Sequence, residues 1–358
     1  MAISIGQPGS LKNILSKIED QGFSHINSLE DINDFLKNYE SKKSEIYTIT
    51  ENKIGLELNT LKADIDRHRI VLNDNYRIKK KTLIHRINNL VAKKDRLHNL
   101  VLKTKLARFI VKFRLAITGF RIHHLKRSSI KRIHKATKPL KKKIFLFEVK
   151  YNDLSKNKNR VIERRAAQEI KELDKIKTFL DNERSLISGA YGEVLVSKEL
   201  EKLSDEFIIL HDFNAQFNPP VFIKKTNDRV LSIQIDHVVL SKAGIFLVET
   251  KNWSRESVNS IDLRSPVEQI VRNGSAMFFK IQDAINDNKI HLKKNHWGQK
   301  KIPIRNLIVM INNKPQEDFQ FVKIKLLKEL NSYLEYFDQV LSYEELESIK
   351  NWLLELKK

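Results

Sequence analysis

The stretch LSIQIDHVVLSKAGIFLVETK, residues 231–251, contains two apolar runs on either side of Ser241-Lys-Ala-Gly244. The four separating residues have the composition of a tight turn, so the two runs are predicted to pair as a β-hairpin. With these four residues as the loop, Leu240 lies opposite Ile245. Apolar side chains occupy both faces of the hairpin, which is typical of central strands in a sheet that is covered on both sides.

This register brings two acidic side chains together. Asp236 lies opposite Glu249, and Lys251 points to the same face because side chains alternate along a strand. Directly opposed residues have Cβ atoms roughly 4.5–5.5 Å apart, and like charges in such pairs are destabilising. The repulsion is relieved if one carboxylate stays protonated or if a cation binds between the two. Mg²⁺ suits the second solution because it prefers hard oxygen ligands.

The same residues also allow a purely structural explanation, in which Lys251 forms a buried ion pair with Asp236 or Glu249. With a metal present, Lys251 would instead orient or activate a water molecule, or offset charge on a phosphate. The choice depends on the register, since a loop of another length would place Asp236 elsewhere. The opposite face is predicted to carry Ile233, Ile235, His237 and Val239, with His237 as a packed, hydrogen-bonded core residue.

The residues after Ser188 alternate between short β-rich runs and helical patterns. Further β-rich runs occur at Phe207–Leu210 and Ile304–Ile311, and helical patterns cover about 266–286 and 343–356. This alternation predicts an α/β domain.

Long helices are predicted upstream, because Gly119 and Pro139 are the only helix breakers between Gly55 and Gly189. Apolar residues follow 3–4 spacing in two successive registers, first Leu83, Ile87, Leu90, Leu97 and Val101, then Leu102, Leu106, Phe109, Phe113 and Ala116. The change of register indicates a stutter or a helix break. The region is therefore predicted to be a coiled coil or a helical hairpin, bent near Ser128–Ser129 or Pro139, with a homodimer as a possible outcome. Residues 158–186 are predicted to form a connecting helix.

The positive charge is concentrated in one segment. Residues 75–150 hold all of the excess behind the formal net charge of +22, since their many lysines and arginines are accompanied only by Asp95 and Glu148. Such a block repels itself unless it binds a polyanion or stays solvated. Nucleic-acid phosphates explain it best, although the basic amphipathic stretch 101–120 would also suit an anionic membrane surface.

Cysteine is absent, which excludes disulfides, thiolate metal sites and cysteine nucleophiles. This composition fits a cytoplasmic protein. No run of about 18 apolar residues occurs, so a transmembrane helix is not expected.

Three short motifs lie in a defined order along the C-terminal half. Gly189-Ala-Tyr-Gly192-Glu193 opens a predicted helix, Ile235-Asp236-His237 lies on the first hairpin strand, and Glu249-Thr250-Lys251 lies on the second. Together they resemble the nuclease-related domain (NERD), a branch of the PD-(D/E)XK nuclease superfamily, over about residues 187–312. Ile235 stands where the superfamily has its eponymous proline, a departure that is ordinary within this branch.

The resemblance implies a restriction-endonuclease-like core, in which a mixed sheet is flanked by helices. It implies catalytic roles for Glu193, Asp236, Glu249, Lys251 and Gln269. It also implies Mg²⁺ or Mn²⁺ held by Asp236, Glu249, Glu193 and Thr250. On family grounds alone, it suggests a role in bacterial defence against foreign DNA.

The sequence therefore predicts three domains: an N-terminal helical segment (1–55), a basic long-helix region (56–186) and a nuclease-related domain (187–358). The expected function is metal-dependent hydrolysis of DNA, with the basic helices binding the nucleic-acid backbone. Two alternatives stay open. The first is a nucleic-acid-binding or scaffold protein with an inactive nuclease fold, and the second is a peripheral membrane or coiled-coil assembly factor.

Overall fold

The computed structural model describes residues 1–101, 103–253, 264–293, 300–315 and 317–357. The chain divides into two compact units, one formed by 1–39 with 174–358 and the other by 40–173. These limits differ from the three segments expected from the sequence, whose boundaries at 55 and 186 stay predictions.

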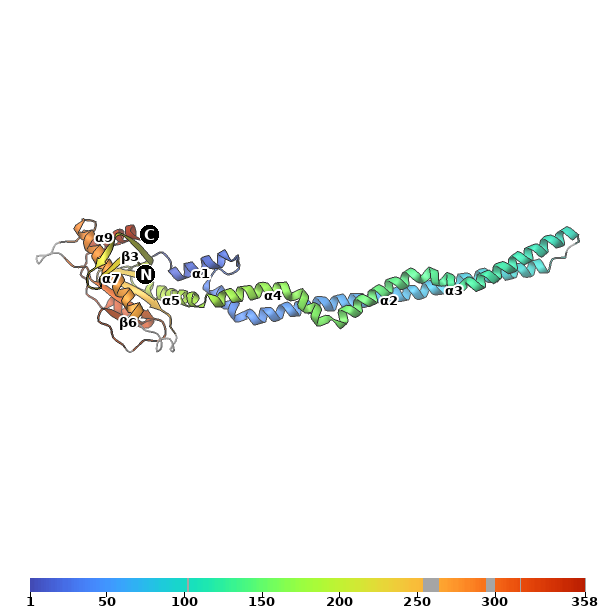
Figure 1. The fold of residues 1–358 in the computed structure, drawn as a ribbon, viewed down its shortest axis with the longest axis horizontal. Coiled ribbons are helices and arrows are strands. Elements are labelled where there is room, and N and C mark those ends of the chain that lie inside the picture. Colours follow the sequence, from blue (N-terminus) through green and yellow to red (C-terminus); the bar gives the residue numbers. More distant parts are fainter. Residues whose placement is uncertain (102, 254–263, 294–299, 316, 358) are drawn as a thin grey trace. The chain divides into compact units, whose positions relative to one another are not determined.

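The first unit is built on a mixed six-stranded sheet, in which the strands are ordered β1 to β6 across the sheet. Figure 1 shows β3 and β6 of this sheet together with α5, α7 and α9. The β2–β3 and β3–β4 pairs are antiparallel, and the other neighbours are parallel. The strands are β1 (Ile3–Ile5), β2 (Ile208–Ile223), β3 (Asp228–Ser241), β4 (Gly244–Lys251), β5 (Ile304–Met310) and β6 (Val322–Leu326).

Helices cover both faces of the sheet. One face packs against α7 (Arg264–Asn286) and α9 (Tyr343–Leu356), and the other against α5 (Arg184–Leu200) and α8 (Leu330–Glu335), which follows the 3-10 turn Leu327–Glu329. The predicted fold class, a mixed sheet flanked by helices, is therefore confirmed. The start of α7 and both ends of α9 fall close to the limits that the apolar periodicity indicated.

The N-terminal residues complete this unit, which the sequence did not predict. Ile3–Ile5 pairs in parallel with β2, and α1 (Gly9–Asp20) packs on α5. A strand of three residues is too short to show a recognisable alternation of apolar and polar side chains. Its partner strand also begins only at Ile208, far along the chain.

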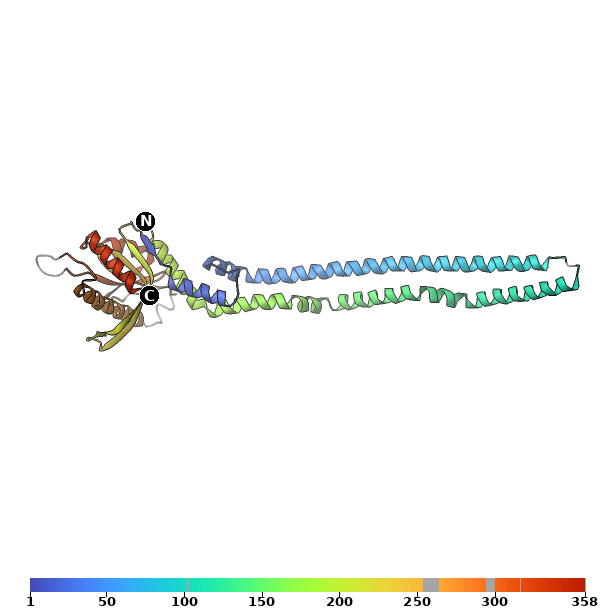
Figure 2. The same ribbon diagram turned by 90° about the horizontal axis from the view of Figure 1, so that it is seen from above.

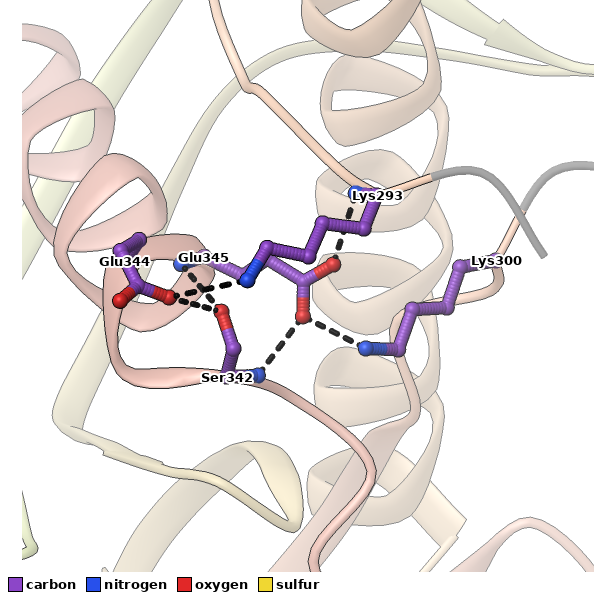
Figure 3. A network of polar contacts seen from close by, with 5 residues as sticks. All are labelled: Lys293, Lys300, Ser342, Glu344 and Glu345. Carbon is purple, nitrogen blue, oxygen red and sulfur yellow. Dashed lines mark hydrogen bonds and ion pairs between the residues drawn. The ribbon is translucent and has the colours of Figure 1, made fainter.

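A buried, fully paired acid fixes the start of α9. Ser342 and Glu345 form a capping box, in which each side chain accepts a hydrogen bond from the other's backbone N–H. Glu345 is 1% exposed, and its carboxylate also accepts from Lys300 Nζ at 2.5 Å and from the Lys293 N–H at 2.9 Å (Figure 3). Burial raises the pKa of Glu345, but these hydrogen bonds outweigh burial, so that its pKa is lowered overall.

The second unit is helical. It consists of α3 (Lys105–Lys156) and of the parts of α2 (Leu29–His98) and α4 (Lys158–Asn182) that lie within 40–173. Within the unit, α2 and α3 run side by side (Figure 2), and ion pairs join Arg69 to Glu148 at 2.6 Å and Glu57 to Lys150 at 3.0 Å. A small core of Ile54, Leu61, Leu154 and Val161 lies between the helices. The prediction of long helices in a hairpin is therefore confirmed.

The chain turns between α2 and α3, where the two apolar registers meet, so the predicted helix break is confirmed. α3 runs without interruption through Ser128–Ser129 and Pro139, so neither ends a helix. Pro139 is exposed, and the Thr137 hydroxyl nearby donates to the Ile133 carbonyl at 3.0 Å.

The two registers differ in burial. In the first, Leu83, Ile87, Leu90 and Leu97 are half-buried, although Val101 is 94% exposed. The second register was predicted to be a seam, but Leu106, Phe109, Phe113 and Ala116 are exposed, and Leu102 lies outside the described residues. The part of α3 that faces inward instead carries Val111, Leu115, Thr118, Ile122 and Leu125. Within the described ranges, no helix combines the length and apolar character needed to cross a bilayer.

Candidate active site

The β3–β4 hairpin has the predicted register. Leu240 pairs with Ile245 and the ladder runs to His237 and Val248, while Ser241 pairs with Gly244 so that the turn is tighter than four residues. The β3–β4 ladder stops one position before Asp236 and Glu249, although β4 continues to pair with β5 as far as Lys251. The carboxylate of Asp236 accepts the Thr250 N–H at 2.7 Å. At the point where the two strands separate, a hydrogen bond from the β4 backbone to the Asp236 side chain therefore follows the last backbone pairs of the ladder.

A kink in the β2–β3 ribbon accompanies this separation. His211 pairs with His237 and Phe213 with Ile235, and Asp212 between them has a φ of 47°. Ile235 packs in the same core cluster as Val238, although strict alternation would put them on opposite faces. The predicted face of Ile233 and Ile235 was therefore wrong. The side chains change phase at Asp212 and Asp236, and a sequence pattern of period two cannot show such a kink.

Asp236 lies in a crowded, buried acidic environment. Burial raises its pKa well above the usual range, and the carboxylates of Glu249 and then Glu193 raise it further. The Thr250 N–H and the Lys251 ammonium act in the opposite direction and are outweighed. The three acids from α5, β3 and β4 thus interact electrostatically, as the sequence led us to expect.

Glu249 and Lys251 form an ion pair at the end of β4. The Lys251 Nζ lies 2.8 Å from Glu249 Oε1, and the side chains are 21% and 8% exposed respectively. The ion pair that the structural explanation required is therefore present between Lys251 and Glu249. The pKa of Asp236 nevertheless stays raised. One ammonium does not neutralise the whole cluster.

Glu193 is brought to this edge of the sheet by a close contact between helix and strand. A Cβ at the preceding Gly192 would lie 3.1 Å from Thr250 Cγ2 and 3.0 Å from Asn252 Cβ, so glycine lets α5 approach β4. Gly189, three residues earlier on α5, faces the Ser10 hydroxyl instead. Glu193 is 6% exposed, and burial raises its pKa.

Ser10 is a contributor that the sequence did not reveal. Its backbone N–H donates to Glu193 at 3.0 Å, and its hydroxyl donates to the other carboxylate oxygen. These bonds oppose the effect of burial on the Glu193 pKa. They also direct the carboxylate at the first turn of α1, where the helix dipole favours negative charge.

Asp212 is a second residue that was missed. Its carboxylate accepts from Asn214 Nδ2 at 2.8 Å and from Gln234 Nε2 at 3.3 Å. It lies so close to Gly9 that a Cβ there would be 2.7 Å from Asp212 Oδ1. Its charge contributes to the raised pKa of Glu193. Nothing in the sequence around Asp212 distinguishes it, because its position depends on the kink and on α1.

The remaining predicted residues lie around this cluster. His237 is fully buried, with its Nδ1 2.7 Å from Nδ1 of His211, which confirms a packed, hydrogen-bonded role. Thr250 is buried and its hydroxyl has no partner among the described residues. Gln269 is exposed on α7, and in the described part of the chain no hydrogen bond joins it to the three acids.

The cluster offers hard oxygen donors, which are the ligands that Mg²⁺ and Mn²⁺ prefer. Among the described residues, no three acidic or histidine side chains are arranged around a common ion-binding point. The raised pKa of Asp236 and the unpartnered Thr250 hydroxyl nevertheless fit a cluster whose oxygen donors would accept a cation. Asp236 and Glu249 are the best candidates to hold one, with Glu193 and Thr250 beside them.

Comparison with known proteins places the site in a family. Residues 188–311 match the model of the nuclease-related domain, which spans the acids on α5, β3 and β4. An uncharacterized protein of Bacillus anthracis is 30% identical over 110 residues, which is 30% of this chain and 45% of that protein. The match therefore spans less than half of the relative's length, and no solved structure matches. Residues 188–311 of this chain are a nuclease-related domain.

Proposed function

We propose that this protein is a nuclease that hydrolyses phosphodiester bonds of DNA with the help of Mg²⁺ or Mn²⁺. The observation that carries this proposal is the crowding of Asp236, Glu249 and Glu193 where β3 separates from β4, inside a nuclease-related domain. Burial and this crowding raise the pKa of Asp236 and of Glu193, and such perturbed acids are typical of functional sites.

Each acid has a proposed role. Asp236 and Glu249 hold the metal, and Glu193 and Thr250 assist directly or through water. A bound dication would supply positive charge at the phosphate and lower the pKa of a coordinated water.

Lys251 is proposed to provide an ammonium group beside the reacting phosphate. Its ion pair with Glu249 holds the ammonium at the same strand end. From there it can orient the attacking water or stabilise charge that develops on a phosphate oxygen. Gln269 is proposed to act from α7 on substrate or water.

The basic helices of the second unit are proposed to bind the nucleic-acid backbone. Their charge suits phosphates, because binding releases counterions from the polyanion. Contacts to phosphate carry no sequence information. We therefore expect binding that tolerates sequence and weakens steeply as salt rises.

The test is cleavage of duplex DNA by the full-length protein in Mg²⁺, Mn²⁺ or EDTA, with RNA as a parallel substrate. Asp236→Asn and Lys251→Met should each lower the rate by at least about 100-fold, because each removes charge at the reacting phosphate. Asp228→Asn, which alters a half-buried acid at the start of the same strand that pairs with Arg272 outside the cluster, is the matched control and should cleave normally. Equal rates for Asp236→Asn and the control would reject the site.

A second candidate function is binding without cleavage. It is favoured by the contacts that already engage two of the acids, Lys251 on Glu249 and Ser10 on Glu193. Under this alternative the protein binds DNA in a salt-sensitive manner, binding persists in EDTA, and no divalent ion supports cleavage.

A further inference from the structure

The first part of α3 exposes a row of large apolar side chains. Phe109, Phe113 and Phe120 are 69%, 61% and 71% exposed. They belong to what we call the apolar stripe: Leu106, Phe109, Ile110, Phe113, Ile117 and Phe120, all of which are exposed. Steps of three and four residues put these side chains on one face of the helix.

The apolar stripe is distinct from the surface with which α3 packs inside its unit. That surface carries Val111, Leu115, Thr118, Ile122 and Leu125, which are half-buried or buried. It follows the same three-four spacing but starts from a different position on the helix. The beginning of α3 therefore has two apolar faces, and only one of them is covered by the unit itself.

Basic residues border the apolar stripe on both sides. With 3.6 residues per turn, Lys105, Arg108 and Lys112 lie along one edge, and Arg114 and Arg121 lie along the other. All five side chains are exposed. The sequence contains no aspartate or glutamate from Arg96 to Phe147. Any partner that covers the stripe must therefore accept apolar side chains in the middle and positive charge at both edges.

We propose that the apolar stripe docks on the surface of an anionic lipid bilayer, with α3 lying in the plane of the interface. An interfacial helix buries its apolar face about 5–10 Å into the boundary between headgroups and acyl chains. Lysine and arginine side chains at the edges reach up to the headgroups while their methylene stems stay in apolar surroundings. Acidic headgroups complement the basic edges.

Two other occupants fit less well. A second copy of the same helix would bring basic edges against basic edges, and no acidic residue in this segment compensates for that repulsion. A nucleic-acid backbone would neutralise the basic edges, but its phosphates make no use of a row of leucine, isoleucine and phenylalanine side chains. The lipid surface satisfies both the charge and the apolar face.

The first experiment is flotation of the full-length protein with phosphatidylcholine vesicles, with or without phosphatidylserine. The wild type should float with the phosphatidylserine vesicles and remain behind with phosphatidylcholine alone. The triple variant Phe109→Ser, Phe113→Ser, Phe120→Ser should bind the anionic vesicles about 100-fold more weakly, because it removes three inserted rings. The matched control Phe222→Ser, Leu231→Ser, Phe321→Ser removes exposed apolar side chains from the sheet unit and should float like the wild type.

Parallel measurements separate the other occupants. The triple variant should keep the helix content, the DNA affinity and the sedimentation coefficient of the wild type. Failure of the wild type to float on anionic vesicles, or equal flotation of the triple variant, would overturn the proposal. So would a loss of DNA affinity that matches the loss of flotation, or a shift of the variant from dimer to monomer.

A labelled variant gives a direct readout. The natural chain contains no cysteine, so Phe113→Cys supplies a unique site for a polarity-sensitive fluorophore. Anionic vesicles should shift the emission of this label to the blue, whereas the same label on Ala136→Cys, an exposed position outside the stripe, should not respond. A label at position 113 that stays in a water-like environment on saturating vesicles would refute insertion of the stripe.

Discussion

Two acidic groups in the same unit have pKa values that are shifted in opposite directions. Glu345 is 1% exposed, yet hydrogen bonds from Lys300, Ser342 and Lys293 lower its pKa below the usual range. Asp236 is half-buried, but its neighbours include Glu249 and Glu193, and its pKa is raised. Burial acts upward on both groups, so the difference comes from the partners. One acid is satisfied by the protein alone, and the other belongs to a cluster that needs a further positive charge.

The largest effect is expected where the paired acid is removed. Glu345→Gln should lower the free energy of unfolding by about 3 kcal/mol, because it leaves the half-buried Lys300 without its counter-charge. Urea denaturation measures this loss. Glu344→Gln on the same turn is the control, since its ion pair with Lys293 is exposed and screened by solvent, so its loss should change the stability little. If both variants lose the same stability, Glu345 is not the structural acid described above.

The buried pair of His211 and His237 extends the comparison from acids to groups that are positively charged when protonated. Burial lowers the pKa of His211 to about 4, whereas the unfolded chain titrates near 6.5. Between these values the unfolded state binds more protons, so the stability from neutral His211 is complete above about pH 6.5 and is lost as pH falls towards 4.

Lowering the pH from 7 to 5 should therefore reduce the free energy of unfolding by about 2 kcal/mol through this residue. Denaturation of wild type and His211→Asn at both pH values isolates the contribution, and the variant should lose less stability on acidification. An equal loss in both proteins would show that His211 is not held neutral.

The acidic cluster around Asp236 should respond to charge removal in the opposite direction from Glu345. Asp236→Asn keeps a carbonyl oxygen that can accept the Thr250 N–H but removes one of the crowded charges. In EDTA at neutral pH, this variant should be more stable than wild type by about 1–2 kcal/mol, as is common where function and stability conflict. A clear destabilisation would mean that Asp236 is structurally satisfied like Glu345.

The smallest effect concerns the contact between α1 and the cluster. Ser10→Ala removes the hydroxyl donor to Glu193 but leaves the backbone N–H, so stability should fall by about 1 kcal/mol. The pH at which nuclease activity reaches half its maximum should rise, because Glu193 loses a bond that favours its charged form. An unchanged pH profile would assign Ser10 to helix docking alone.

The features of the fold and the site that depend on nearby residues could be predicted from the sequence. The turn residues between Leu240 and Ile245 fixed the hairpin register, and that register placed Asp236 next to Glu249 and Lys251. The start of α9 follows from Ser342 and Glu345, which have the spacing of a capping box. Each of these features depends on residues that lie close together in the chain.

The features that the sequence did not predict depend on contacts between segments that are far apart in the chain. The contact of Ser10 with Glu193 joins residues that are 183 positions apart, and β1 acquires its partner only when the sheet forms. The faces of Ile233 and Ile235 depend on a kink opposite Asp212. In α3 the pattern contained two apolar faces, and sequence periodicity could not tell which of them would be covered by the hairpin.

Thermal unfolding with increasing Mg²⁺ or Mn²⁺ tests the central claim most directly, because an ion that binds only the folded state raises the melting temperature. Wild type and Glu345→Gln should both be stabilised by the divalent ion over an ionic-strength control, whereas Asp236→Asn should not. Stabilisation of Asp236→Asn equal to that of wild type, or none in wild type, would contradict the account of this cluster as a metal-binding site.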